Sequence, residues 1–176
     1  GSDLMSTQGH QFALQLMEYM REVMIEFQEH TGNIYNLEAT PAEGTTYRLA
    51  RLDKKQYPHI KTANEGGEPF YTNSTHLHVH AEDDLFVHLK RQDPLQTKYT
   101  GGTVFHTFLG EDQLPTETVK ALVKKIAHNF ELPYYTLTPT FSICKDHGHI
   151  AGEHRSCPRC EQTCEVYSRV VGYLRP

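Results

Sequence analysis

The residues of this 176-residue chain best suited to chemistry are its four cysteines, which all lie between Cys144 and Cys164. Cys157 and Cys160 form a CxxC pair, and thiolates carried on such short turns can surround a tetrahedral Zn²⁺. We predict a zinc site formed by Cys144, Cys157 and Cys160, with Cys164 as the fourth ligand. His147, which follows Cys144 at CxxH spacing, is the alternative fourth ligand.

A redox-active CxxC pair is the competing interpretation of Cys157 and Cys160. Such a pair normally opens a helix in a thioredoxin-like fold, a context missing here, and it would leave Cys144 and Cys164 without a role. Cysteines crowded into one segment favour a metal site in a reducing compartment over a disulfide framework. We therefore expect a structural zinc site in a cytoplasmic protein.

The composition limits the classes of partner. The chain is 38% hydrophobic and 22% charged, as expected for a folded domain. Seventeen basic against 22 acidic residues give a net charge of −5 without a basic stripe, which argues against direct nucleic-acid binding. No window reaches the ~18 apolar residues of a membrane span, so we expect no membrane partner.

The elements that must position the cysteines alternate between helix and strand. A helix is predicted over residues 7–30, stopped by Gly32, with the methionines Met17, Met20 and Met24 filling the core. The remaining predictions are a strand over 36–40, helices over 45–55 and 81–91, a strand over 104–109, a helix over 116–130 with its buried stripe, and strands over 134–138 and 166–174. This alternation indicates an α/β fold.

Two further segments contain candidate binding residues. Residues 40–44 lead through a turn into a predicted helix, where free backbone N–H groups and the helix dipole can bind an anion; a ligand-free helix cap is the alternative. His76, His78 and His80 share one face of a predicted strand and can hold a transition metal, or form the polar face of a half-exposed strand.

Gly172 lies within the terminal stretch "EVYSRVVGYLRP". Glycine weakens a strand interior, so its presence there suggests close backbone approach or chemistry at the backbone. Removal of a hydrogen atom from its Cα would leave a planar radical, delocalised over the adjacent amide groups, with no side chain to clash.

Several stretches resemble the anaerobic (class III) ribonucleoside-triphosphate reductases. The most specific are "EVYSRVVGYLRP", "GEHRSCPRC" and "YYTLTPTFSIC", and "TGNIYNLEATPAEGTTYRLARLDKK" and "YTGGTVFHTFLGE" resemble barrel segments of that family. The resemblance implies the C-terminal part of a ten-stranded α/β glycyl-radical-enzyme barrel over residues 1–140. A zinc-ribbon-like site and radical loop would then occupy residues 141–176.

The resemblance also implies roles and partners. Gly172 would store a radical installed by a separate activating enzyme that uses S-adenosylmethionine and an iron–sulfur cluster. The cysteine cluster would be the zinc site beside the radical loop, and the turn containing Thr40, Ala42, Glu43 and Gly44 would bind substrate phosphate. The implied partners are this activating enzyme, the remainder of the reductase barrel, a ribonucleoside triphosphate and a second subunit in a homodimer, with formate or a dithiol as reductant.

Among the departures from the family pattern, a missing cysteine matters most for the chemistry. The family needs a cysteine that becomes a thiyl radical, and no cysteine precedes Cys144. We therefore expect this chain to be inactive alone. It would act as one part of a reductase or as a radical-bearing replacement part, and the non-enzymatic alternative is a zinc-ribbon interaction module.

Overall fold

The computed structural model describes residues 3–63, 67–78, 84–109, 114–169 and 174–175. The chain divides into two compact units, the first comprising Gly1–Phe105 with Leu132–Tyr134, and the second His106–Glu131 with Tyr135–Pro176. Residues within each unit contact one another more than they contact the other unit. The functional division into residues 1–140 and 141–176 stays a prediction. Among the described residues, no helix has the length and apolar character needed to cross a membrane.

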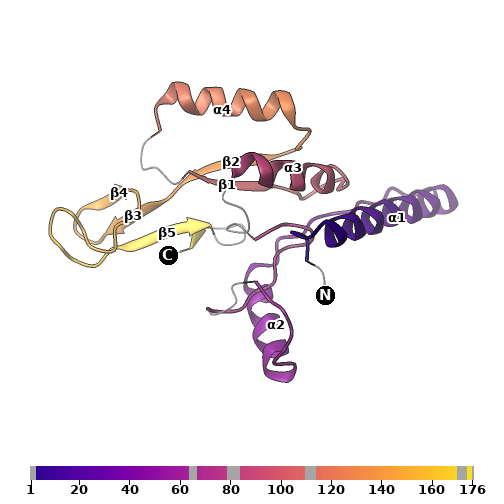
Figure 1. Ribbon diagram of the computed structural model, residues 1–176, viewed down its shortest axis with the longest axis horizontal. Helices are drawn as coiled ribbons and strands as arrows, with labels where there is room; N and C mark the ends of the chain where they lie inside the picture. Colours follow the sequence, from indigo (N-terminus) through magenta and orange to yellow (C-terminus); the bar gives the residue numbers. More distant parts are fainter. Residues whose placement is uncertain (1–2, 64–66, 79–83, 110–113, 170–173, 176) are drawn as a thin grey trace. The chain divides into compact units, whose positions relative to one another are not determined.

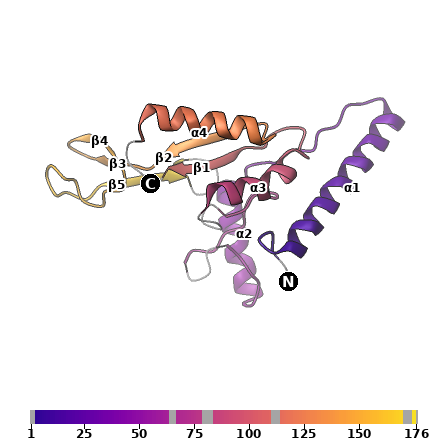
Figure 2. The ribbon, with the colours of Figure 1, turned by 45° about the horizontal axis from the view of Figure 1, so that its top comes forward.

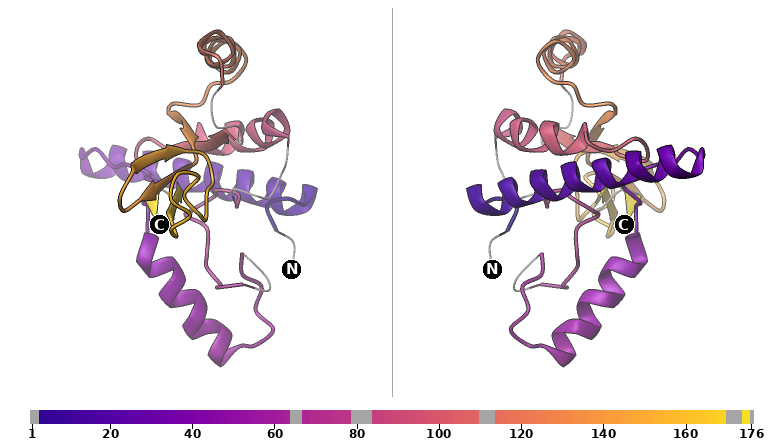
Figure 3. Two further views of the ribbon diagram at one scale, coloured as in Figure 1. Left: turned by 90° about the vertical axis from the view of Figure 1, so that its left-hand side faces the viewer. Right: turned by 90° about the vertical axis from the view of Figure 1, so that its right-hand side faces the viewer.

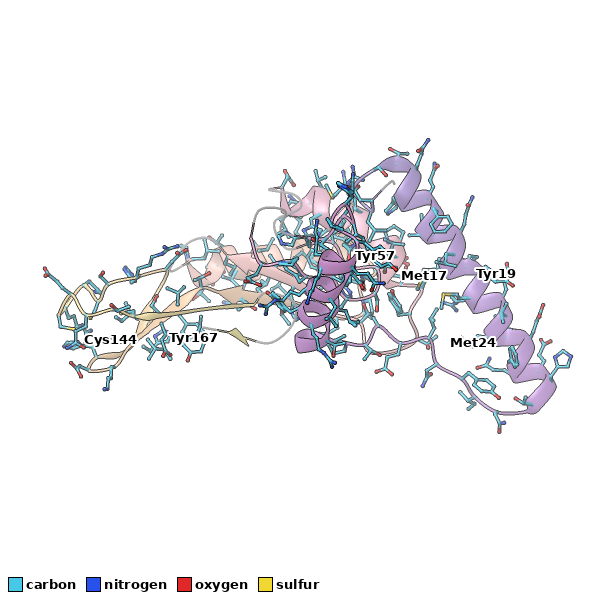
Figure 4. The ribbon with its side chains drawn as sticks, turned by 90° about the horizontal axis from the view of Figure 1, so that it is seen from below. Met17, Tyr19, Met24, Tyr57, Cys144 and Tyr167 are labelled. Atoms are coloured by element: carbon cyan, nitrogen blue, oxygen red, sulfur yellow. The ribbon has the colours of Figure 1, made fainter. Side chains whose placement is uncertain are left out.

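The first unit begins with the long helix α1, Thr7–Thr31. Ser6 caps it by accepting a hydrogen bond from the N–H of Gly9, and Gly32 ends it in the left-handed region at φ 69°. The helix and its stop are therefore confirmed. The predicted methionine core is confirmed only for Met17, which is buried, because Met20 is 41% exposed. Figure 4 shows Met17 and Tyr19 on different sides of the helix.

The core of the first unit lies where α1 meets α3, Leu85–Gln96. Figure 2 shows these two helices side by side. Asp84 caps α3 through hydrogen bonds from two backbone N–H groups, so this helix begins later than the predicted residue 81. The buried residues of this core are Ala13, Met17, Ala39, Leu95 and Tyr99.

Helix α2, Glu43–Gln56, begins at Glu43 rather than at the predicted residue 45. In both views of Figure 3 it extends away from α1. The strand predicted over residues 36–40 is wrong, because the segment forms only an isolated bridge between Glu38 and Gly101. A single bridge does not make the continuous ladder that a strand requires.

The second unit begins with a strand–helix–strand arrangement of β1 (Phe105–Leu109, whose first residue is counted with the first unit), α4 (Thr116–Asn129) and β2 (Tyr135–Pro139). The strands β1 and β2 form a two-stranded sheet, and Figure 1 shows α4 running alongside it. The predicted buried stripe of α4 is confirmed only in part. Ile126 is buried, but Val123 is 39% exposed.

A four-stranded sheet of order β4-β3-β5-β6 completes this unit. Its strands are β3 (Phe141–Cys144), β4 (Gly148–Ala151), β5 (Glu165–Arg169) and β6 (Leu174–Arg175), each antiparallel to its neighbours. The single strand predicted over residues 166–174 is therefore wrong, because two antiparallel strands occupy its ends. Gly172 lies between them, outside the described residues. The chain is thus a mixed helix and sheet structure, as the α/β prediction required.

Candidate metal centre

Two hairpin-like segments bring the cysteines together. Strand β3 ends at Cys144, and a three-residue turn returns the chain into β4. The second segment folds back on itself through hydrogen bonds from the N–H of Cys157 to Gln162 O (2.7 Å) and from the N–H of Cys164 to Arg155 O (3.0 Å). These two hydrogen bonds hold the backbone of the knuckle in its folded-back form.

Four donor atoms lie within 4.8 Å of one another, contributed by Cys144, His147, Cys157 and Cys160. The Nδ1 of His147 lies 3.6 Å from the Sγ atoms of both Cys144 and Cys157, and the Sγ atoms of Cys144 and Cys160 are 3.7 Å apart. Around a tetrahedral zinc, two sulfur ligands lie about 3.8 Å apart, and a sulfur and a nitrogen about 3.6 Å apart. These three distances match those around a tetrahedral zinc, and the group of four donors can hold such a metal.

The protein environment favours the thiolate form at two of these positions. Burial raises the pKa of Cys157, but hydrogen bonds from the N–H groups of Arg159 and Cys160 outweigh burial and lower this pKa to about 7. Burial also raises the pKa of Cys144, but the hydrogen bond with His147 and neighbouring backbone N–H groups bring it below its usual value. Thiolates are the form that binds metals, so the environment suits metal binding at Cys144 and Cys157. At Cys160 the hydrogen bond with the backbone of Gln162 lowers the pKa, but burial and the neighbouring thiols of Cys157 and Cys144 outweigh it and raise this pKa to about 11, so metal binding there has to displace a proton.

Cys164 lies against the same cluster but outside the group of four donors. It is buried, and its Sγ faces the carbonyl oxygen of Gln162 at 3.8 Å. Burial and the neighbouring charges of Cys144 and Cys157 raise its pKa, which favours the neutral thiol. The structure thus brings together three of the predicted cysteine ligands with His147, the alternative fourth ligand.

The candidate anion-binding turn lies at the start of α2. Thr40 is exposed, Ala42 is the N-cap residue, and Glu43 and Gly44 are the first two residues of the helix. The N–H groups of a first helical turn have no acceptor within the helix, and no side chain caps this one. The arrangement can bind an anion, which is the chemistry predicted for this turn.

Asn73 is a contributor to this turn that the sequence analysis did not identify. Its buried side chain accepts a hydrogen bond from the N–H of Ala42 (3.1 Å) through Oδ1. Its carbonyl oxygen lies 2.8 Å from Nδ1 of His76. No sequence signal could have found this contact, because the two segments are distant in the chain.

The predicted histidine face is not formed as a strand over its described part. Residues 76–78 have no regular secondary structure, and His80 lies outside the described residues. The ring nitrogens of His76 lie at hydrogen-bond distance from the carbonyl oxygens of Asn73 and Val104. His78 stacks on Phe70 with ring centroids 5.1 Å apart. Within the described part of the chain, the only group of donors that can hold a metal is the cysteine cluster.

Comparison with known proteins places the whole sequence in one family. A family model described as "Anaerobic ribonucleoside-triphosphate reductase" matches residues 1–176. The anaerobic ribonucleoside-triphosphate reductase of Escherichia coli (strain K12) is 26% identical over 170 aligned residues, which cover 90% of this chain and 23% of that protein. The protein of the same name from Enterobacteria phage T4 is 30% identical over 101 residues, or 57% of this chain and 16% of that protein.

Solved structures agree with this result. The anaerobic ribonucleotide reductase from Thermotoga maritima with MES in the active site matches at a TM-score of 0.72 and 26% identity. The match covers 97% of this chain and 27% of that one, so this chain spans about a quarter of the length of its relatives. Since the family model matches the entire sequence, the chain belongs to the anaerobic ribonucleoside-triphosphate reductase family.

Proposed function

We propose that this chain is the C-terminal, glycyl-radical-bearing portion of an anaerobic ribonucleotide reductase. In the complete enzyme, ribonucleoside triphosphates are reduced to 2′-deoxyribonucleoside triphosphates by radical chemistry at the ribose. The observation that carries this proposal is the position of the four-donor cluster at the start of the strand that leads to Gly172. The reducing cytoplasm suits both the free thiols and such a radical.

The support comes from the register of the sheet. Strand β3 ends at Cys144, and β5 begins at Glu165, directly after the cysteine segment. The two strands pair antiparallel, with Ile143 opposite Glu165. The ring of Tyr167 on β5 stacks on the ring of Phe141 on β3, with the two ring centroids 5.4 Å apart. Figure 4 labels Cys144 and Tyr167 on these neighbouring strands. The cysteine segment thus leads directly into β5, and the pairing of β5 with β3 sets the register of this strand.

The proposed ligands are Cys144, Cys157, Cys160 and His147. A zinc ion would crosslink the β3–β4 turn to the cysteine knuckle, and it would leave no position open for a substrate. Strand β5 would hold the backbone of Gly172, from which a separate activating enzyme that uses S-adenosylmethionine and an iron–sulfur cluster would remove a Cα hydrogen atom.

Electron paramagnetic resonance tests the radical. Anaerobic treatment of the zinc-loaded chain with such an activating enzyme should give a doublet signal, since the radical couples to the one hydrogen remaining on Cα. The Gly172→Ala variant should give no such doublet. Gly101→Ala is the matched control, because a methyl group added at Gly101 meets nothing within 4 Å. An unchanged doublet from Gly172→Ala would remove Gly172 from this role.

Substrate phosphate would bind at the start of α2. The backbone N–H groups of residues 43–45, in the first turn of α2, would supply the donors, and Asn73 accepts a hydrogen bond from the preceding residue, Ala42. Titration with inorganic triphosphate should shift the amide resonances of residues 43–45 in nuclear magnetic resonance spectra. The amides at the start of α4, which like α2 begins without a side-chain cap and with a glutamate in its first turn, serve as the matched control and should not shift. Equal shifts at both helices would indicate non-specific binding.

A catalytic thiyl cysteine has to come from outside this sequence. All four cysteines belong to the cluster segment, and three of them are proposed zinc ligands. The remainder of a reductase barrel, in the same polypeptide or in another, is therefore the proposed partner, together with a second subunit as in a homodimer. The second candidate function is a radical-bearing replacement part without activity of its own. It is favoured because all four cysteines lie in the metal-binding segment, so that none is proposed as a thiyl radical.

A further inference from the structure

Helix α1 exposes an apolar stripe that the described chain covers only in part, as where the ring of Phe27 meets that of Tyr35 edge-on. The stripe consists of Phe12, Leu16, Tyr19, Met20 and Phe27, which are between 41% and 66% exposed. At 100° per residue, these five positions fall within about 100° of one another on the helix surface. A helix with such a stripe normally buries it, yet the residues that α1 buries are Ala13 and Met17.

The stripe continues into a hollow on the first unit. Phe12 and Leu16 line a hollow of about 640 Å³, together with Ala63 and Leu77 from the segments that face α1. All of its lining residues belong to this unit. A partner side chain that packs on the stripe can therefore enter a preformed depression, which gives the surface shape as well as apolar area.

Charge restricts which partner fits this surface. Glu22, Glu26 and Glu29 are exposed along one border of the stripe, within about 60° of one another on the same helix. Burying the stripe would bring any partner close to this acidic row. The complementary surface is therefore an apolar segment with lysine or arginine residues on one side.

We propose that the α1 stripe is the docking surface for the part of an anaerobic ribonucleotide reductase that this chain does not contain. This inference rests on the proposed function. The relatives are about four times as long, and they align with nearly all of this chain, so three quarters of each relative is available to cover surfaces that are exposed here. The occupant would be an apolar segment of that larger part, with basic residues facing Glu22, Glu26 and Glu29.

Co-expression tests the docking. The full 176-residue chain is produced together with the E. coli relative from which the matching region has been deleted, so that both parts fold in each other's presence. Co-purification and light scattering then measure the complex. Leu16→Glu should weaken association about tenfold or more, because burying a leucine contributes on the order of a factor of ten in affinity. Ile25→Glu is the matched control: Ile25 is 44% exposed on the opposite side of the same helix, so association should stay within about twofold.

Circular dichroism verifies that both variants keep the helix content of the parent chain. The inference is overturned if the unchanged chain fails to associate, or if Leu16→Glu and Ile25→Glu associate equally well. It is also overturned if the chain alone forms a dimer that Leu16→Glu dissociates, because the occupant would then be a second copy. If the unchanged chain gives the radical doublet but does not associate with the larger part, this inference alone is refuted. If the unchanged chain associates but gives no doublet, the proposed function is refuted.

Discussion

The Nδ1 of His147 lies 3.6 Å from the Sγ of Cys157, although the two residues come from separate turns. This distance equals that between a nitrogen and a sulfur on a tetrahedral zinc, about 3.6 Å. The contact places His147, rather than Cys164, in the group of four donors that could hold a metal ion. It also connects the turn after β3 to the cysteine knuckle before β5.

The identity of the fourth ligand leads to the first prediction. His147→Ala should lower the zinc content from about one ion per chain to a small fraction, because three ligands remain. Cys164→Ser should keep about one ion, since Cys164 lies outside the group of four donors. Metal analysis after gel filtration gives both values. The reverse pattern would make Cys164 the ligand.

Zinc affinity should fall as the pH is lowered through 7. Cys160, whose pKa is raised to about 11, must release a proton to the solvent throughout this pH range, and below the pKa of Cys157, about 7, a second proton competes with the metal, so the dependence on pH becomes steeper there. Each proton that zinc must displace costs about a factor of ten in affinity per pH unit. Competition with a chromophoric chelator between pH 6 and 8 measures the slope, and a pH-independent affinity would contradict the proposed donor set.

Removal of zinc should loosen one region selectively. Because metal binding supplies folding free energy to small sites, chelation should speed hydrogen exchange at the amides of β3, β4 and residues 155–164. The amides of α3, which belong to the other compact unit, should keep their rates. Hydrogen-exchange mass spectrometry separates the two regions. Equal loss of protection in both would show that the metal supports the whole chain.

His76 should make the first unit less stable at low pH. Burial lowers the pKa of His76 below its ordinary value of 6.5, while hydrogen bonds to Asn73 and Val104 oppose this shift. The unfolded chain therefore binds more protons near pH 6, and the free energy of unfolding falls as the pH drops below 6.5. His76→Gln should remove this dependence, whereas a change at the exposed His59 should not. Hydrogen exchange of α3 amides from pH 5 to 8, corrected for intrinsic rates, measures the difference.

Gln96 should be important for the stability of the first unit. Its side chain is fully buried, donates to Oε1 of Gln92 at 2.7 Å and accepts from the hydroxyl of Thr103. Gln96→Ala leaves a cavity and polar groups without partners, which should cost about 2–4 kcal/mol of unfolding free energy. Lys90→Ala on the exposed face of the same helix should change it by less than about 0.5 kcal/mol. Urea unfolding compares the two variants.

Local sequence determined the features that depend on neighbouring residues. The spacing of apolar residues and the stop at Gly32 predicted α1 nearly to its ends, because capping and helical periodicity are local effects. The close spacing of Cys157 and Cys160, and that of Cys144 and His147, predicted the candidate ligands for the same reason. The strand over residues 36–40 was predicted wrongly, since a strand also needs a partner that only the fold provides.

Tertiary structure decided which of the candidate groups meet. It placed His147 among three sulfur atoms, set Asn73 against Ala42, and paired β5 with β6 instead of forming one strand. It also left Met20 on the α1 stripe 41% exposed, although the helical spacing predicted that the methionines of this helix fill the core. The physical reason is that periodicity identifies the apolar face of a helix, but whether that face is buried depends on what packs against it, which the sequence of the helix does not contain.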